Sequence, residues 1–144
     1  MEEELKRFPG WLVWHALISP KLALREASVT PLGGETYRVR LVVENSGWLP
    51  SYITKKALEK KIMRGVICEI ELPKGARLES GKLREELAQL EGRAYKTAML
   101  DEFDEATSDR VKAEWVVHAP KGGTVKLTAR HDRAGVVRTK VKLI

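Results

Sequence analysis

Three histidines are the residues of this chain best suited to acid–base or metal chemistry: His15, His118 and His131. None has a carboxylate three positions later, and none belongs to an H-E-x-x-H pair, so the spacing of a zinc hydrolase is absent. His118 falls on the outward side of an expected strand and His131 in an expected turn. We therefore interpret both as solvated side chains. The sequence also lacks a G-x-S-x-G elbow and a glycine-rich loop between a strand and a helix.

The remaining reactive groups do not favour catalysis either. Cys68 is the only cysteine, so it has no disulfide partner, and its alternation with Val66 and Ile70 predicts a core position. The five acidic residues between 99 and 109 lack the spacing and central glycine of an EF-hand, which disfavours calcium. Nothing in the sequence buries a pair of carboxylates to raise a pKa. We expect no enzyme activity, metal or other cofactor in this chain.

A period-two alternation over residues 37–44 is the clearest structural signal. The odd positions are apolar and the even positions are charged, with Val42 as the exception. This alternation predicts a strand with one buried face. Residues 45–47, Asn-Ser-Gly, favour a tight turn because asparagine and glycine tolerate a positive φ. The Trp-Leu-Pro corner at 48–50 follows directly, so we expect it to pack over the edge of a sheet.

Similar short segments bounded by turns run along the rest of the chain and predict six to eight strands. Thr54 is a suitable cap for a short helical insertion near 55–63. Pro9-Gly10 should break any N-terminal helix, the Trp11–Trp14 cluster has neither helical nor strand period, and residues 96–110 are expected to form a loop. The predicted strands lie at 22–29, 36–45, 65–72, 76–81, 85–91, 113–118, 125–130 and 137–143.

These features predict an all-β fold, an immunoglobulin-like Greek-key β-sandwich. A chain of 144 residues fits one domain, which we place at 20–144, with 1–19 as a linker or junction segment. No apolar run approaches the ~18 residues of a membrane span, and no secretion signal is expected at the N-terminus. The compartment is left open, although a single cysteine is compatible with the cytoplasm.

Two surfaces could bind a ligand. A basic face follows Thr54, and with a net charge of +6 it is a candidate anion patch, although a solvated face explains it as well. Nucleic acid is disfavoured, because most other bases sit at alternate strand positions. Trp48 and Tyr52 form a candidate platform for a sugar ring, whereas Trp115 is in phase with the core. The residues of the basic face are Lys55, Lys56, Lys60, Lys61 and Arg64.

Three segments together carry a family resemblance: ENSGWLPSYITKKAL, EELAQLEGRA and AEWVVHAPKGGTVKLTARHDRAGVVRTKVKL. They resemble the C-terminal region of bacterial zinc carboxypeptidases of the carboxypeptidase A-like family, in which a small immunoglobulin-like sandwich follows an α/β catalytic domain. The resemblance runs from about Pro20 to Ile144, and its most specific parts are the Asn45–Pro50 corner and the Arg133–Gly135 turn. The zinc ligands and catalytic glutamate of that family have no counterpart here.

The resemblance implies a non-catalytic accessory domain of a metallocarboxypeptidase, which supports the zinc-containing catalytic domain or binds a peptide substrate or partner. Trp11 and Trp14 would then lie at the junction with that domain, within a segment spanning Phe8–Ile18. The alternatives are a stand-alone adhesion or carbohydrate-binding sandwich that uses Trp48 and Tyr52, and an anion- or nucleic-acid-binding basic domain.

Overall fold

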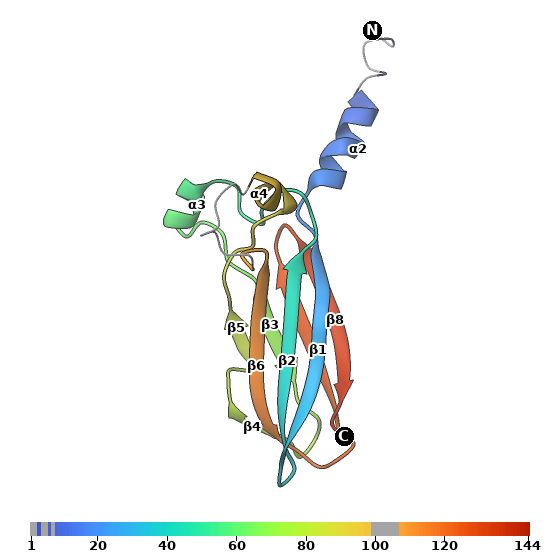
Figure 1. The fold of residues 1–144 in the computed structure, drawn as a ribbon, viewed down its shortest axis with the longest axis vertical. Helices are drawn as coiled ribbons and strands as arrows, with labels where there is room; N and C mark the ends of the chain where they lie inside the picture. The colour runs from blue at the N-terminus through green and yellow to red at the C-terminus, as the bar shows by residue number, and fades with distance from the viewer. Residues whose placement is uncertain (1–2, 4–5, 7, 99–106) are drawn as a thin grey trace.

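A computed structural model describes Glu3, Lys6, residues 8–98 and residues 107–144. Its eight strands form two four-stranded sheets, and every pairing is antiparallel. Figure 1 shows the two sheets packed face to face, with the helices gathered at one end. The first sheet has the order β1-β2-β6-β4, with β1 at Leu22–Gly33, β2 at Thr36–Asn45, β6 at Arg110–His118 and β4 at Arg77–Ser80. The second has the order β5-β3-β7-β8, with β5 at Arg84–Glu86, β3 at Ile67–Glu71, β7 at Thr124–His131 and β8 at Gly135–Lys142.

This arrangement confirms the predicted all-β sandwich. The order β1-β2-β6-β4 is that of the A-B-E-D sheet of an immunoglobulin domain, and β3-β7-β8 is that of its C-F-G sheet. The chain changes sheet at every connection from β2 to β7 and stays within one sheet only at β1–β2 and β7–β8. These crossings between the sheets give the Greek-key connections. The strand that pairs with the other side of β3 departs from the immunoglobulin arrangement in one respect. This strand, β5, follows β4 in the chain instead of coming directly after β3.

The core lies between the sheets and is built from alternate strand residues. Val39, Leu41 and Val43 of β2 are buried as their alternation predicts, and Cys68 is 1% exposed, also as predicted. Trp115 is buried with them, and its indole N–H donates to the carbonyl of Lys82 at 2.8 Å. A buried tryptophan thus keeps its one polar group satisfied.

The N-terminal segment corrects one prediction. Residues 8–18 form a continuous helix, α2 (Phe8–Ile18), although Pro9-Gly10 was expected to break it. Pro9 lies in the first turn, where its missing N–H has no intrahelical acceptor and its fixed φ suits a helix. Gly10 lowers helix propensity by only about 1 kcal/mol and does not end it. The Trp11–Trp14 cluster, which had no assigned period, is therefore helical.

Residues 82–98 correct a second prediction. The strand expected at 85–91 ends at Glu86, after which the chain leaves the sheet. Helix α4 (Arg93–Ala98) then begins before the expected 96–110 loop and occupies residues 96–98 of it. The corner after β2 holds this helix start, because the backbone N–H of Arg93 donates to Gly47 O at 3.1 Å. The rest of the predicted loop, 99–106, and most of its acidic residues lie outside the described part of the chain.

The insertion after the corner is confirmed but shorter than predicted. Helix α3 (Lys55–Glu59) begins after Thr54, whose hydroxyl accepts from the N–H of Ala57 at 3.2 Å. Ile62 lies beyond the helix and is exposed. No helix in the described residues is both long and apolar enough to cross a bilayer.

Candidate functional site

Parts of the three motifs that carry the family resemblance meet at the end of the sandwich that bears α2, α3 and α4, which we call the helix end. Three segments from distant parts of the sequence lie at this end. They are the corner, extended here to residues 45–52, the segment at 89–92 and the turn at 131–134. Hydrogen bonds join all three to one another or to the start of β1. The motifs therefore build one structure, which fixes where the helices leave the sandwich.

Asn45 lies at the centre of this structure and is 2% exposed. Its Oδ1 accepts from the backbone N–H of Lys21 at 2.9 Å and of Gly47 at 3.0 Å. Its Nδ2 donates to the carbonyls of Leu49 at 2.8 Å and Glu91 at 3.1 Å. One amide side chain thus joins the start of β1, the corner and the 89–92 segment.

Glycines allow the backbones to approach closely at this point. A Cβ at Gly47 would lie 2.2 Å from the carbonyl oxygen of Ser19, and one at Gly92 would lie 2.3 Å from that of Trp48. Both neighbours are main chain, so a side chain could be accommodated only by moving the backbone. The glycines of the corner and of the 89–92 segment are thus explained by packing.

A buried polar cluster of Ser51, Gln89 and His131 lies below the corner. Gln89 Oε1 accepts from Ser51 Oγ at 2.7 Å and from His131 Nε2 at 2.8 Å. His131 Nδ1 accepts from the backbone N–H groups of Arg133 at 3.2 Å and Ala134 at 3.3 Å. The imidazole is therefore the neutral tautomer that carries its proton on Nε2.

These contacts overturn the prediction that His131 is a solvated turn residue. It is the last residue of β7, it is 4% exposed, and burial lowers its pKa because the charged form is desolvated. Both ring nitrogens are occupied by structural bonds. The arrangement resembles a catalytic triad only in composition, because Gln89 accepts from both neighbours and the Ser51 hydroxyl is fully buried.

The turn after β7 holds the far side of the corner. Arg133 Nη1 donates to the carbonyl of Tyr52 at 2.9 Å, and the Tyr52 hydroxyl donates to Glu91 Oε1 at 2.6 Å. Burial, together with the bond to Glu91, raises the pKa of Tyr52 to about 12. In the described residues, no stacking contact joins Tyr52 to Trp48, the other half of the predicted sugar platform, which is 46% exposed.

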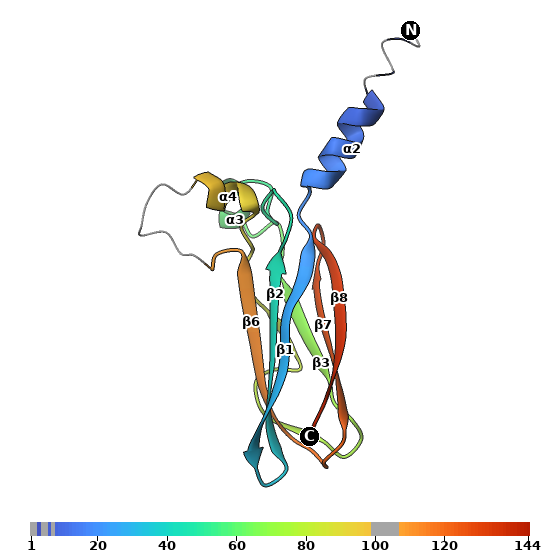
Figure 2. The same cartoon turned by 45° about the vertical axis from the view of Figure 1, so that its right-hand side comes forward.

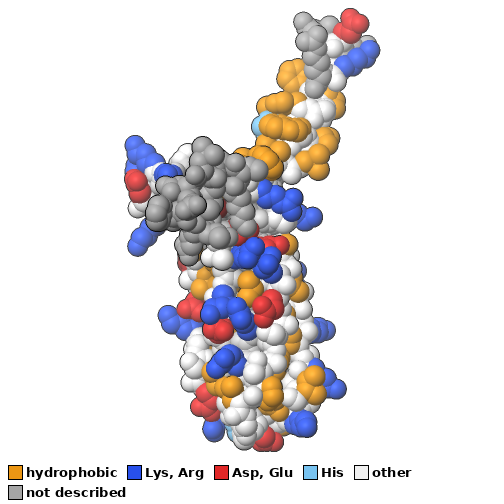
Figure 3. All heavy atoms as spheres, in the orientation of Figure 1, with side chains coloured by type: hydrophobic (Ala, Val, Ile, Leu, Met, Phe, Trp, Pro, Cys, Tyr) orange, Lys and Arg blue, Asp and Glu red, His pale blue; other side chains and the backbone are white. Residues whose placement is uncertain are grey.

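Helix α2 leaves this rigid end at a fixed point. The carbonyl of Ile18 accepts from the N–H of Leu49 at 2.9 Å, and Ser19 Oγ donates to His15 O at 2.8 Å. From Ile18 back towards Phe8 the helix projects away from the sandwich (Figure 2), and none of its residues is buried. Figure 3 shows its apolar side chains as a continuous exposed surface. Its large apolar residues are between 54% and 75% exposed: Phe8, Trp11, Leu12, Val13, Trp14 and Leu17.

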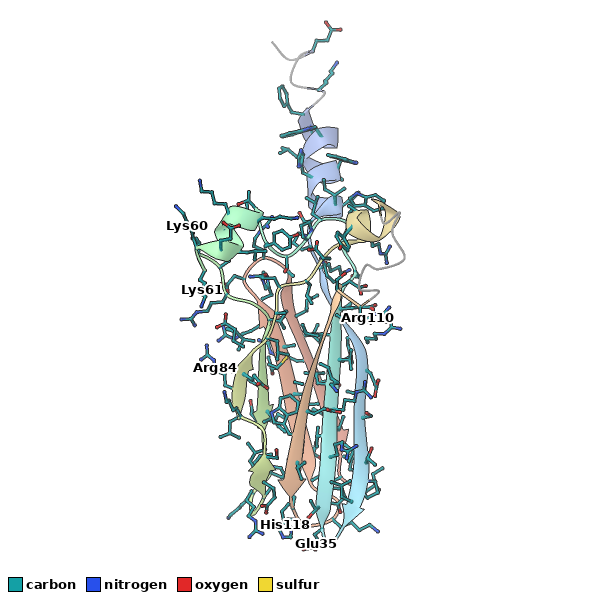
Figure 4. All side chains as sticks on the ribbon, turned by 60° about the vertical axis from the view of Figure 1, so that its left-hand side comes forward. Glu35, Lys60, Lys61, Arg84, Arg110 and His118 are labelled. Atoms are coloured by element: carbon teal, nitrogen blue, oxygen red, sulfur yellow. The ribbon has the colours of Figure 1, made fainter. Side chains whose placement is uncertain are left out.

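The basic face also lies at the helix end. Figure 4 shows Lys60 and Lys61 pointing away from the sandwich. Within the described residues, none of its five cations forms an ion pair. A groove of about 610 Å³ runs between Lys61 and Arg64 on one side and Glu86 and Gln89 on the other.

The chemical groups considered in the sequence do not converge. His15 lies on α2, His131 at the helix end, and His118 beside Glu35 at the opposite end of the sandwich (Figure 4). Cys68 is buried, and burial raises the pKa of its thiol to about 12. No group of three or more potential metal ligands occurs among the residues that the structure describes.

Sequence reasoning missed the side-chain roles of Asn45, Gln89, His131 and Arg133. The available signal was that each is a polar residue inside one of the quoted motifs, next to a glycine or a turn. Their partners, however, lie elsewhere in the sequence.

The helix end thus defines a β-sandwich domain with an apolar helix fixed to one end. The chain belongs to the family described as a domain of unknown function, DUF8731, whose model matches residues 21–142. The match begins at the residue before β1 and leaves α2 outside. No curated protein and no solved structure matches the chain.

Proposed function

We propose that this chain is a non-catalytic accessory domain whose helix α2 packs inside a neighbouring folded domain. The observation that carries the proposal is the exposure of α2 on all its sides. The resemblance in the quoted motifs supports a particular neighbour, the catalytic domain of a zinc metallocarboxypeptidase. In this role the sandwich supports and positions that domain, or contacts its peptide substrate, and breaks no bonds itself.

A helix that is apolar all round belongs in the interior of a large protein or in a membrane. The eleven residues of α2 are about 16 Å long, whereas a bilayer span needs about 20 residues. A helix lying on a membrane surface needs a strongly polar face, and His15 is the only polar side chain of α2. These lengths and compositions favour the interior of a protein.

The free energy available from this contact is large. Six big apolar side chains of α2 each keep about half of their surface exposed. Burying that surface is worth roughly 1 kcal/mol for each side chain, or on the order of 6 kcal/mol for the helix. Because the hydrogen bond from Leu49 to Ile18 fixes the end of α2, the neighbour would be held in one orientation against the sandwich.

The first test is the size of the native protein in its source cells, measured by immunoblot against this chain. A band far above the 16.2 kDa of the chain supports a covalently attached neighbour, and a band at that mass contradicts it. Zinc-dependent release of C-terminal residues from peptides by the purified chain would contradict the non-catalytic role.

A pair of variants tests the role of α2 directly. Replacing Trp11 and Trp14 together by alanine should leave the sandwich as stable as the wild type, because neither side chain is buried against it. Val39→Ala in the core is the matched control and should destabilise by about 1–3 kcal/mol. If the double variant is destabilised as much as the core variant in urea unfolding, α2 packs on its own sandwich and the proposal is wrong.

One observation favours a second candidate, an anion-binding surface at the basic face. Its five cations form no ion pair within the described residues, and two of them, Lys61 and Arg64, line a groove of about 610 Å³. Binding to phosphates should weaken steeply with salt. No shift with DNA or RNA at low salt would end this alternative. The sugar-binding alternative gains no support from the geometry, since the Tyr52 hydroxyl is committed to Glu91.

A further inference from the structure

Strand β8 is the edge of its sheet, since the order β5-β3-β7-β8 ends there. The edge of the other sheet, β1, runs beside it. The two strands are joined at the helix end, where the N–H of Leu22 donates to Ala134 O at 2.7 Å. Their far ends lie apart in Figure 2. The outward N–H and C=O groups of such an edge can pair with a further strand.

A groove of about 380 Å³ opens between the far halves of these two strands. Ala27 and Val29 contribute from β1 and Val141 from β8, and these three side chains also pack against the core. The added strand would point every second side chain towards the space between the sheets, and this space is predominantly apolar. The complete lining consists of Ala27, Val29, Pro31, Val141, Lys142 and Ile144.

Three exposed cations, Arg138, Lys140 and Lys142, form a stripe at alternate positions of β8, and the last of them also borders the groove. We call these three cations the β8 stripe. Residues on one face of a strand are about 6.6–6.8 Å apart, so the charges are regularly spaced. No carboxylate among the described residues lies within ion-pair distance of any of the three.

The acidic side chains on this face of the sheet are engaged elsewhere. Glu69 contacts Arg84 at 3.4 Å and Arg130 at 3.6 Å, and Glu71 contacts Lys126 at 2.9 Å. The register sets Lys126 directly opposite Lys140 of the stripe, and like charges at such a position are destabilising. The stripe is therefore an excess of positive charge that the sheet itself does not neutralise.

We propose that the β8 edge binds an extended segment of a partner protein in which acidic residues alternate with apolar residues. The segment adds a strand beside β8, sets its carboxylates against the β8 stripe and turns its apolar side chains into the groove beside Val141. A second copy of this chain does not fit, because its own β8 stripe would repel the first. The inference does not depend on the role proposed for α2, which lies at the helix end.

The test uses an N-acetylated, C-amidated nonapeptide that alternates glutamate with valine, and fluorescence anisotropy of a labelled copy at low salt. We expect saturable binding to the full chain and new hydrogen-exchange protection of β8 amides. A peptide of the same composition with its glutamates grouped at one end should bind about tenfold more weakly, because the carboxylates no longer match the strand spacing. An N-methylated copy should not protect β8.

Variants of the chain supply the matched control. Arg138→Gln with Lys140→Gln should weaken binding of the alternating peptide about tenfold, since two ion pairs to its carboxylates are lost. Arg38→Gln with Lys82→Gln makes the same change in net charge at exposed side chains on β2 and on the link between β4 and β5, and should leave the affinity within about twofold. The fluorescence of the buried Trp115 and the unfolding midpoint establish that both variants are folded.

Three outcomes overturn the proposal. The first is no binding of the alternating peptide to the folded wild-type chain. The second is an equal loss of affinity in the stripe variant and the control variant with Arg38→Gln and Lys82→Gln, which would show a response to net charge alone. The third is equal binding of the alternating and grouped peptides, or displacement of the peptide by single-stranded DNA at the same concentration of charge. Either of these results would identify a surface that binds polyanions in general.

Discussion

Replacing Asn45 by alanine should be among the most damaging single changes outside the apolar core. The side chain makes four hydrogen bonds to the main chain and is 2% exposed. The alanine variant leaves two backbone N–H groups and two carbonyls without those partners. The start of β1, the corner and the 89–92 segment then lose the group that joins them.

The magnitude follows from burial. A buried polar group that loses its partner costs about 1–3 kcal/mol. Gly47 is buried, whereas Lys21 is exposed and Leu49 and Glu91 are partly exposed, so water can reach some of the four groups. We therefore expect Asn45→Ala to lower the free energy of unfolding by about 3–5 kcal/mol, a large part of the ~5–15 kcal/mol of a typical domain.

Urea unfolding followed by tryptophan fluorescence and by circular dichroism measures this loss. Ser46→Ala is the matched control, because the Ser46 hydroxyl makes one bond, to Lys21 O at 3.2 Å, and its loss should cost less than about 1 kcal/mol. Asn45→Asp keeps the acceptor but turns a carboxylate towards two carbonyls, and it should be as damaging as alanine at pH 7. An alanine variant within about 1 kcal/mol of the wild type would refute the reasoning.

Three further changes test other contacts. Because burial lowers the pKa of His131, stability should be complete above about pH 6.5 and fall as the pH drops below that value, and a titration of the unfolding midpoint should lose this slope in His131→Gln. A slope unchanged in the variant would assign it to other groups. Cys68, with its pKa raised to about 12, should react with a thiol reagent only at the rate of unfolding, so fast labelling of the native chain would contradict its burial. Gly47→Ala places a Cβ against Ser19 O and should destabilise by about 2–4 kcal/mol in thermal unfolding, whereas Gly123→Ala, which meets Pro73 at 3.0 Å, should cost less.

The strands could be predicted where neighbouring residues decide them. The alternation over 37–44 identified β2 because a strand with one buried face alternates in sequence. The Thr54 cap identified the start of α3 in the same way. The helix α2 was missed because an apolar helix has no polar face to produce a 3.6-residue period. Its sequence gives the same signal whether it is helical or extended.

The candidate site could be predicted only in part. The corner was predicted as a structural feature, but Trp48, expected to pack over the sheet edge, is 46% exposed. Tyr52, the other half of the predicted platform, is partly buried and bonded to Glu91. His131 was misplaced because its burial depends on Gln89, 42 positions away in the sequence. The strand expected at 85–91 was too long. Leu87 and Ala88 still bond to Val66 beside β3, but Leu90 bonds to the corner through the N–H of Ser51.

The sequence by itself determined the strands, the turns and the alternation that separates the core from the surface, because these depend on residues one to four positions apart. Only the tertiary structure decided that Asn45, Gln89, His131 and Arg133 meet at one end, and that the β8 stripe adjoins an apolar groove. The partners that join these segments to one another lie 24 to 82 positions away along the chain. Such contacts follow from how two sheets stack and in which register, which is a property of the whole chain.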